Sequence, residues 1–343
     1  MKYKNKSLVI TTIAKDNNFV LKKYSKIAIK NKIQFVVIGD KKSPKNFFLN
    51  GIDYYSLKKQ KKLNFKLAKI LPINHYSRKN IGYLIAMQNK SDCIIETDDD
   101  NIPLKNFLSN NNTNQKTFLL KNKGWVNIYN FFSDKNIWPR GFALEELKKA
   151  TPRKGKLIKL ESYIQQGLAD LNPDVDAIYR LTNKLPINFF KKINSVSLGN
   201  GSICPFNSQN TTWIKPAYPL MYLPSYCSFR MTDIWRSFVA QRVAWSCGWS
   251  IMFHKSSVFQ KRNVHNLMND FIDEIPGYTH NYKIMQKLVM LKLLPGTKNL
   301  KKNMLKCYKE FIKMNLINKR EILLLNKWFE DIERIKKNFN LTD

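Results

Sequence analysis

Short apolar runs separated by amphipathic segments dominate the first hundred residues. Leu8–Ile13, Ile33–Ile38 and Cys93–Ile95 are apolar and rich in β-branched residues, which is typical of buried strands. Between the first two runs, Phe19–Lys30 carries apolar residues at helical spacing. A strand, helix, strand order with short joins favours a parallel sheet. The pattern therefore predicts an α/β fold in which the strand tips lie at one edge.

The rest of the chain shows shorter periodic segments. Phe118–Leu120 and Trp125–Tyr129 are expected to be strands, and Glu161–Leu171 is an amphipathic segment. Thr232 precedes an apolar helical face and is expected to cap that helix at its start. From about Asn281 the pattern predicts lysine-rich amphipathic helices.

Three adjacent aspartates, Asp98, Asp99 and Asp100, follow the third strand directly. Their charges repel one another, and ligands of α/β sheets bind at strand ends. A divalent cation, Mn²⁺ or Mg²⁺, would hold the cluster together, because it binds carboxylate oxygens and substrate phosphates at once. Side chains alternate along an extended chain, so Asp98 and Asp100 are expected to face one way and Asp99 the other. The triplet predicts a metal–diphosphate site, and an acidic loop or helix cap is the alternative.

Further candidates lie at neighbouring strand tips and on the helix before the triplet. Thr11 and Asp40 end the first two strands, and Asp40 could accept a hydrogen bond from a nucleotide base or ribose, or could be a turn residue. Two cations at a helix start form an anion site, and a glycine there permits close approach. The residues of this helix start are Arg78, Lys79, Asn80 and Gly82.

The second half of the chain offers separate candidates. Arg140 lies between a proline and a glycine on a stiff turn, where it could bind a diphosphate in bidentate fashion or simply be a surface residue. Asp233 lies in the first turn of a helix, whose dipole stabilises a carboxylate that could act as a base, although such acids are also common. His254 at a strand end would complement carboxylates around Mn²⁺, or be structural. Asp174 and Asp176 are expected to cap a helix or turn.

The composition points to an anionic partner. Lysine and arginine number 59 against 25 acids, a net charge of +34, which suits nucleic acid, an acidic membrane surface or a phosphorylated substrate. Lysine, asparagine and isoleucine nevertheless recur along the whole chain, as in AT-rich coding sequences. No RNA- or DNA-binding motif is present, so nucleic acid is not an expected partner.

The cysteines and the apolar runs suggest a cytoplasmic protein, either free or peripheral at a membrane. The five cysteines include no CxxC or zinc-type spacing, which indicates reduced thiols. No apolar run approaches the roughly 18 residues that span a bilayer. The apolar run near the start is too short for a signal peptide and lacks a cleavage site, so no membrane anchor is expected.

Seven blocks of the chain, in this order, resemble one family. They are RKNIGYLIA, IIETDDDNIP, WPRGFALE, NPDVDAIYRL, PFNSQNT, SFRMTDIWR and KRNVH. Over roughly Leu8 to Tyr278, the chain resembles the family that includes the plant STELLO glycosyltransferases. More distantly it resembles the reversibly glycosylated polypeptides, which include UDP-arabinopyranose mutases. The resemblance implies a GT-A-like, nucleotide-sugar-binding α/β sandwich over residues 1–280, and we expect a basic helical extension over 281–343.

The resemblance also implies roles for individual residues. The triplet is similar to the DxD motif, which would place Asp98 and Asp99 at the donor nucleotide and Asp98 and Asp100 at the metal. Arg140 lies in a block similar to the arginine-bearing segment of the reversibly glycosylated polypeptides, where sugar attachment or diphosphate contact occurs. Asp233 lies where those proteins have an Asp-Asp-Met-Trp block, although Thr232 replaces the first acid here.

We therefore expect a metal-dependent glycosyltransferase that moves a hexose, such as glucose, from a UDP-sugar to a glycan, lipid-linked or small-molecule acceptor. Asp233 would be the base that activates the acceptor hydroxyl. A nucleotide-sugar mutase or self-glycosylating enzyme is one alternative, and a non-catalytic protein for an anionic surface or nucleic acid is another. The helices after Asn281 are expected to be dispensable for donor binding and to dock on an anionic membrane surface.

Overall fold

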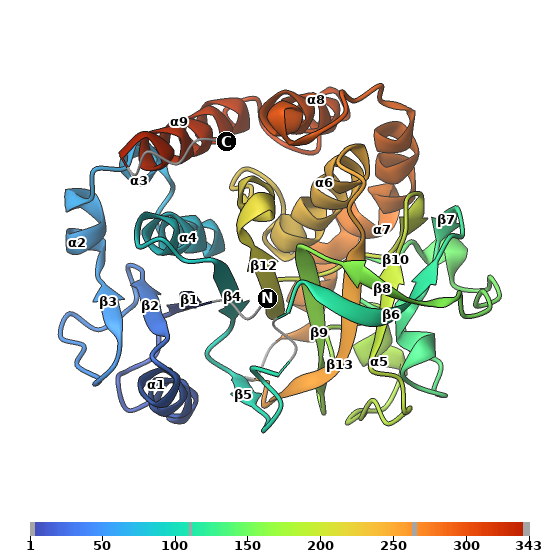
Figure 1. Cartoon of the computed structure of the whole chain (residues 1–343), viewed down its shortest axis with the longest axis horizontal. Coiled ribbons are helices and arrows are strands. Elements are labelled where there is room, and N and C mark those ends of the chain that lie inside the picture. Colours follow the sequence, from blue (N-terminus) through green and yellow to red (C-terminus); the bar gives the residue numbers. More distant parts are fainter. Residues whose placement is uncertain (1–3, 110–111, 263–265, 339–343) are drawn as a thin grey trace.

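A large mixed sheet runs through the molecule. The computed structural model describes residues 4–109, 112–262 and 266–338. Within these residues, eleven strands form one sheet in the order β3-β2-β1-β4-β12-β9-β13-β10-β6-β8, with β5 paired to β13 (Figure 1). A separate small sheet pairs β7 with β11.

The strands of the large sheet are β1 (Lys6–Thr12), β2 (Gln34–Gly39), β3 (Asp53–Tyr55), β4 (Cys93–Thr97), β5 (Asn101–Pro103), β6 (Asn114–Leu120), β8 (Leu157–Glu161), β9 (Ile164–Asp170), β10 (Ser195–Leu198), β12 (Asn210–Ile214) and β13 (Ile251–Gln260). Those of the small sheet are β7 (Gly124–Trp125) and β11 (Ser202–Ile203). The α-helices are α1 (Phe19–Asn31), α2 (Leu57–Lys62), α3 (Lys66–Ile70), α4 (Lys79–Gln88), α5 (Ala177–Thr182), α6 (Thr232–Ser246), α7 (Leu267–Met290), α8 (Leu300–Lys313) and α9 (Glu321–Asn338). The 3₁₀ helices are η1 (Tyr76–Arg78), η2 (Ile128–Phe131), η3 (Leu144–Glu146), η4 (Lys215–Met221), η5 (Phe229–Met231) and η6 (Thr297–Asn299).

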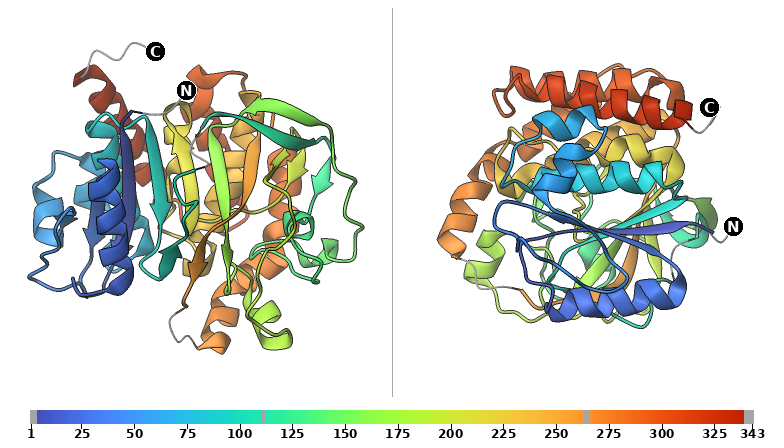
Figure 2. Two further views of the ribbon diagram at one scale, coloured as in Figure 1. Left: turned by 60° about the horizontal axis from the view of Figure 1, so that its bottom comes forward. Right: turned by 90° about the vertical axis from the view of Figure 1, so that its left-hand side faces the viewer.

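The N-terminal part is a parallel α/β unit, as predicted. β1 pairs in parallel with both β2 and β4. Helix α1 covers one face of these strands and α4 the other (Figure 2). Asn18 caps α1, because its side chain accepts hydrogen bonds from the backbone N–H groups of Val20 and Leu21. Gly82 lets α4 lie close to β1, since a Cβ there would be 2.5 Å from Val9 Cγ1.

The second part of the sheet is mixed. β12 is antiparallel to β4 and β9, and β13 runs parallel to β9. This arrangement confirms the predicted α/β fold. Two local predictions need correction. Of the expected strand Trp125–Tyr129, only Trp125 lies in a strand, β7, because Asn127 accepts a hydrogen bond from Tyr129 N and starts η2. The amphipathic segment after Glu161 is the strand β9.

Helices α7, α8 and α9 complete the outer layer on the α4 and α6 side of the sheet (Figure 2). Leu325 and Trp328 of α9 are fully buried in the main hydrophobic core. The expected division at residues 280 and 281 falls inside α7, and it stays a prediction. In the part of the chain that the structure describes, no helix has both the length and the apolar character required to cross a bilayer.

Candidate functional site

The aspartate triplet lies at the edge where β1 and β4 end. Thr12 Oγ1 donates a hydrogen bond to Asp99 Oδ2, and the capping residue Asn18 donates to the Asp99 carbonyl at 3.4 Å. The side chain of β1 that reaches the triplet is thus Thr12 rather than the predicted Thr11, because successive strand residues point to opposite faces. The triplet lies beside the start of α1, as a strand-tip ligand site requires.

Lys79 and a tyrosine bind the first aspartate. Lys79 Nζ is fully buried and lies 2.9 Å from Asp98 Oδ1. Tyr76 OH donates to the same oxygen at 2.8 Å, and Lys79 Nζ donates to Tyr76 OH at 2.7 Å. Burial and then the charge of Asp98 raise the pKa of Tyr76 well above its ordinary value, so its hydroxyl stays protonated. The predicted anion-binding Lys79 therefore neutralises Asp98, and Tyr76 is a site residue that the motifs did not single out.

A hydrogen-bonded path connects this aspartate to Asp233. Ser208 Oγ lies 2.6 Å from Tyr76 OH. Because the single hydroxyl proton of Tyr76 goes to Asp98, the Ser208 hydroxyl donates to Tyr76 OH, and the backbone N–H of Ser208 donates to Asp233 Oδ2 at 3.1 Å. Asp98 and Asp233, predicted independently from distant motifs, thus belong to one polar network. Ser208 lies in the block PFNSQNT, but no feature of that block distinguished it as the link.

Arg140 lies between two carboxylates rather than on the surface. Its Nε and Nη2 bind Asp174 Oδ1 and Oδ2 at 2.8 and 2.9 Å, and Nη2 also binds Asp233 Oδ2 at 3.0 Å. Burial opposes the charge, but Asp174 and Asp233 raise the pKa of Arg140 well above its ordinary value. Asn207 donates a further hydrogen bond to Asp174 at 2.8 Å. Asp174 is thus an ion-pair partner rather than the expected cap, whereas Asp176 does cap α5.

Asp100 faces the far end of β13. Gln260 Nε2 donates to Asp100 Oδ2 at 2.9 Å, and Asn101 Nδ2 donates to Oδ1 at 3.0 Å. Burial and then the charge of Asp98 raise the pKa of Asp100 to about 7, and burial also raises the pKa of Asp99. Because these carboxylates repel one another in a partly desolvated setting, a bound cation would stabilise their ionised forms.

The triplet fits a divalent metal in its chemistry, because it offers hard carboxylate oxygens. Asp98 Oδ1 is occupied by Lys79 and Tyr76. Across the described ranges, no three His, Cys, Asp or Glu side chains gather closely enough to hold a metal ion by themselves. A metal bound by Asp98 and Asp100 would therefore need further ligands, such as the phosphate oxygens of a substrate.

His254 does not lie with the triplet, which corrects its predicted role as a metal ligand. It lies within β13, six positions before Gln260, a separation on the order of 15–20 Å along a strand. The side-chain amide of Gln165 is oriented by a hydrogen bond from its Nε2 to Ser162 O at 3.0 Å. The amide oxygen, Gln165 Oε1, is therefore the atom that lies 3.1 Å from His254 Nε2. The imidazole therefore carries its proton on that nitrogen. Burial lowers the pKa of His254 to about 4, and the side chain is a neutral core residue.

Three arginines lie near one another, and the charge of one of them, Arg262, acts on Asp100. Arg230 binds Glu274 Oε1 through Nε and Nη2 at 2.9 and 2.7 Å, and Arg262 pairs with Asp270. Burial and then the charge of Arg262 lower the pKa of Arg180 to about 10, which shows that these two cations are close.

Arg180 is the least neutralised member of this arginine cluster, which consists of Arg180, Arg230 and Arg262. Its Nη2 donates to Pro173 O at 2.9 Å, while its buried Nε has no hydrogen-bond partner among the described residues. Each arginine lies in one of the seven sequence blocks, although only their proximity in the fold identifies them as a group. The last three residues of the block KRNVH lie outside the described residues.

The remaining predicted nucleotide contacts have structural roles. Asp40 accepts hydrogen bonds from the backbone N–H groups of Asn74 and His75 at 2.7 and 2.8 Å, so it is the turn residue of the alternative prediction. Arg78 binds Gln60 Oε1 at 2.9 and 2.6 Å. Asn80 exchanges two hydrogen bonds with the backbone of Leu223.

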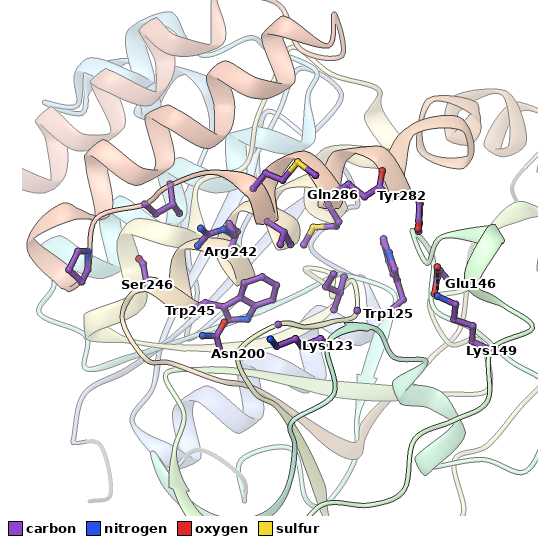
Figure 3. A pocket seen from close by; sticks show the side chains of 18 residues that line it. Lys123, Trp125, Glu146, Lys149, Asn200, Arg242, Trp245, Ser246, Tyr282 and Gln286 are labelled. Atoms are coloured by element: carbon purple, nitrogen blue, oxygen red, sulfur yellow. Dashed lines mark hydrogen bonds and ion pairs between the residues drawn. The ribbon is translucent and has the colours of Figure 1, made fainter.

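A cavity of about 790 Å³ lies elsewhere, between α6, α7 and β7 (Figure 3). Trp245, which lines it, follows Asp233 by twelve positions on α6, a distance of about 18 Å along a helix. The cavity is therefore separate from the polar network at the triplet.

Comparisons with known proteins agree with the sequence blocks. A family model described as STELLO glycosyltransferases matches residues 230–342, which extends past Tyr278 and includes α8 and α9. The chain is 30% identical to the probable glycosyltransferase STELLO2 of Arabidopsis thaliana over 245 residues, 66% of this chain and 32% of the relative. It is 28% identical to the probable glycosyltransferase STELLO1 of the same plant over 235 residues, 63% of this chain and 30% of the relative. The matched part thus spans about a third of each plant protein. A crystal structure titled as that of a mycobacterial protein aligns with 81% of this chain and 75% of its own at 9% identity and a TM-score of 0.39, too low to support an argument.

Proposed function

We propose that this chain, which belongs to the STELLO-type glycosyltransferase family, transfers a sugar from a nucleotide diphosphate donor, a UDP-hexose in the first instance, to an acceptor hydroxyl. The observation that carries the proposal is the continuous network from Asp98 through Tyr76 and Ser208 to Asp233. It joins an acidic triplet suited to a metal–diphosphate to a second carboxylate, which are the two parts that such a transfer needs.

Asp98 and Asp100 would hold a divalent cation, Mn²⁺ or Mg²⁺, together with the donor phosphates. When bound, this cation supplies positive charge that neutralises the diphosphate leaving group. Lys79 fixes Asp98 by its ion pair at 2.9 Å, and Gln260 orients Asp100 through its hydrogen bond at 2.9 Å.

The arginine cluster is the natural second contact for the diphosphate. Arg140 was the predicted contact, but two carboxylates already neutralise it. Arg180 has no carboxylate ion pair among the residues described, and Arg262 directly follows the segment that binds Asp100. Guanidinium groups bind phosphate oxygens through two parallel hydrogen bonds, so Arg180 can hold the leaving group. Arg262, which is paired with Asp270, would add positive charge beside it.

Asp233 is proposed to orient the acceptor side and to serve as the base. Its ion pair with Arg140 at 3.0 Å competes with this use, so an acceptor hydroxyl would have to displace part of that contact. The same pairing argues against self-glycosylation at Arg140, because its guanidinium nitrogens are occupied by Asp174 and Asp233. We therefore favour transfer to a separate acceptor.

Calorimetry with UDP, with Mn²⁺ and then with a chelator, tests the donor site. We expect binding in the presence of metal, and a loss of at least tenfold in affinity with the chelator, because the acidic triplet repels a bare diphosphate. Asp98→Asn and Asp100→Asn should each have a comparable effect.

Asp134→Asn is the matched control, because this aspartate is 67% exposed and pairs with Lys191 away from the triplet. It should leave UDP affinity unchanged. Equal UDP affinity with and without metal would contradict the proposed donor site. A panel of nucleotide sugars, followed by release of the free sugar, would then identify the donor.

A further inference from the structure

The donor network does not use the cavity between α6, α7 and β7. Trp125, Trp245 and Tyr282 present three aromatic rings to it (Figure 3). Its volume of about 790 Å³ falls within the range of small-molecule sites. Aromatic faces in such a space bind flat apolar surfaces and leave polar groups for orientation.

Polar groups are interspersed with these rings. Asn200, Gln286 and Lys123 line the same cavity, and all three are exposed. They provide two amides, which both donate and accept hydrogen bonds, and one ammonium donor. This set binds hydroxyl groups in any orientation, because each hydroxyl also both donates and accepts.

Trp245 adds a hydrogen-bond donor that has no acceptor among the described residues. Its indole Nε1 is buried, and within the described ranges no acceptor lies within hydrogen-bond distance of it. Leaving such a group unpaired costs roughly 1–3 kcal/mol, so an oxygen atom from a ligand would be stabilising there.

We propose that this cavity is a saccharide-binding site, which takes a short neutral oligosaccharide. The apolar C–H faces of the sugar rings would pack on Trp125, Trp245 and Tyr282, while the hydroxyls bind Asn200, Gln286 and the indole N–H. An apolar wall of Met285 and Val289 makes an amphiphile the competing occupant. The interspersed amides favour the sugar, since its hydroxyls can replace the water that these amides bind, whereas an alkyl chain cannot. The binding itself does not depend on the donor site.

Calorimetry of the full chain, without UDP, tests the site. The probes are neutral tetrasaccharides of glucose, galactose, mannose or N-acetylglucosamine, and dodecyl phosphate as the amphiphile. We expect at least one tetrasaccharide to bind at millimolar concentration or tighter. Trp245→Phe keeps most of the aromatic surface and removes the N–H, and it should weaken that binding by about fivefold.

Trp249→Phe is the matched control, because Trp249 packs against Tyr163 with ring centroids 5.0 Å apart and does not line the cavity. It should leave saccharide affinity within about twofold, because its ring does not line the cavity. Asp98→Asn should also retain saccharide binding, so a failure of the proposed donor site is distinguishable from a failure of this one.

A thermal melt checks that the indole N–H is unpaired. Both substitutions remove buried ring volume, but Trp235→Phe should lower the melting temperature by several degrees more than Trp245→Phe, because Trp235 Nε1 donates to Asn281 Oδ1 at 3.0 Å. The proposal is overturned if none of the tetrasaccharides binds, or if dodecyl phosphate alone binds. It is also overturned if Trp245→Phe and Trp249→Phe bind every tetrasaccharide equally well.

Discussion

The hydroxyl of Tyr76 lies on the path between two candidate site carboxylates, so removing this hydroxyl tests the network directly. Tyr76→Phe keeps the ring packed against Phe229, with centroids 6.3 Å apart, but it breaks the contacts to Asp98 and Ser208. We expect turnover to fall about tenfold, equal to ~1.4 kcal/mol of barrier, with UDP affinity within about threefold.

Tyr308→Phe provides the control for the loss of a buried tyrosine hydroxyl. Tyr308 OH donates only a long hydrogen bond to Tyr222 O, at 3.4 Å, and does not contact the network. Turnover in this variant should match the parent protein. Equal losses in both variants would mean that Tyr76 acts through general stability rather than as a positioning residue.

His254 gives a pH-dependent prediction. Its pKa in the fold is about 4, lowered by burial, against about 6.5 in an unfolded chain. Between these values the unfolded state binds more protons, so the free energy of unfolding is highest above pH 6.5 and falls as pH drops toward 4. When the pH is lowered from 7.5 to 4, the free energy of unfolding of the parent should fall by about 2–3 kcal/mol more than that of His254→Gln. Urea unfolding across this range measures it, and parallel curves for the two proteins would refute the assignment.

Sequence reasoning identified the candidate site residues whose chemistry is local. The triplet, Lys79 and Asp233 each follow a strand or start a helix, and such positions are visible in the pattern. Tyr76, Ser208 and the partners of Arg140 were missed because their importance lies in contacts across long sequence separations. Asp174, for example, meets Arg140 across the fold, and nothing next to it in the sequence indicates an ion pair.

At the scale of elements, helix α9 stabilises the N-terminus of α3. Asp331 on α9 is buried and accepts hydrogen bonds from the backbone N–H groups of Lys66 and Leu67, both at 2.9 Å. Asp331→Asn replaces one acceptor with a donor that faces an N–H group, so it should destabilise the fold by about 1–3 kcal/mol. Urea unfolding measures the change through the midpoint at constant slope.

Glu333→Gln, on the same helix, is the control for that prediction. Its side chain is 54% exposed and pairs with Lys301 at 3.1 Å, and exposed pairs contribute little. The variant should stay within about 0.5 kcal/mol of the parent. If both variants behave alike, the contact between α9 and α3 is not structurally important.

The elements that could be predicted are those with clear periodicity and little dependence on neighbours. Phe19–Lys30 was expected as a helix and α1 is Phe19–Asn31, because Asn18 and the apolar spacing define it locally. The segment after Glu161 was ambiguous because β9 is buried on both faces; such a strand shows no alternation. The extent of β13 past His254 depends on its partner β5, which periodicity cannot reveal.

At the scale of the whole molecule, the charge of +34 predicts a salt-sensitive attraction to anionic surfaces. Lys298, Lys302 and Lys309 are exposed near and on α8, away from the triplet. Changing all three to Glu should weaken binding to vesicles with anionic lipid by at least tenfold, since each lysine near the surface contributes about 1 kcal/mol. UDP affinity should not change. Cosedimentation with anionic and neutral vesicles measures the membrane binding, and calorimetry measures the UDP affinity. A loss of UDP affinity would show that the lysines on and near α8 and the donor site are not separate.

The contact between α9 and α3 also has a consequence for how the protein is made. Asp331 accepts a hydrogen bond from the backbone N–H of Leu67, which lies 264 residues earlier in the chain. At about 5–20 residues per second, a ribosome needs on the order of 10–50 s to synthesise the intervening chain. During that time the start of α3 has no cap, and the surface that Trp328 later covers stays open to water. We expect the nascent N-terminal half to be a client of chaperones that hold exposed apolar surface until α9 emerges.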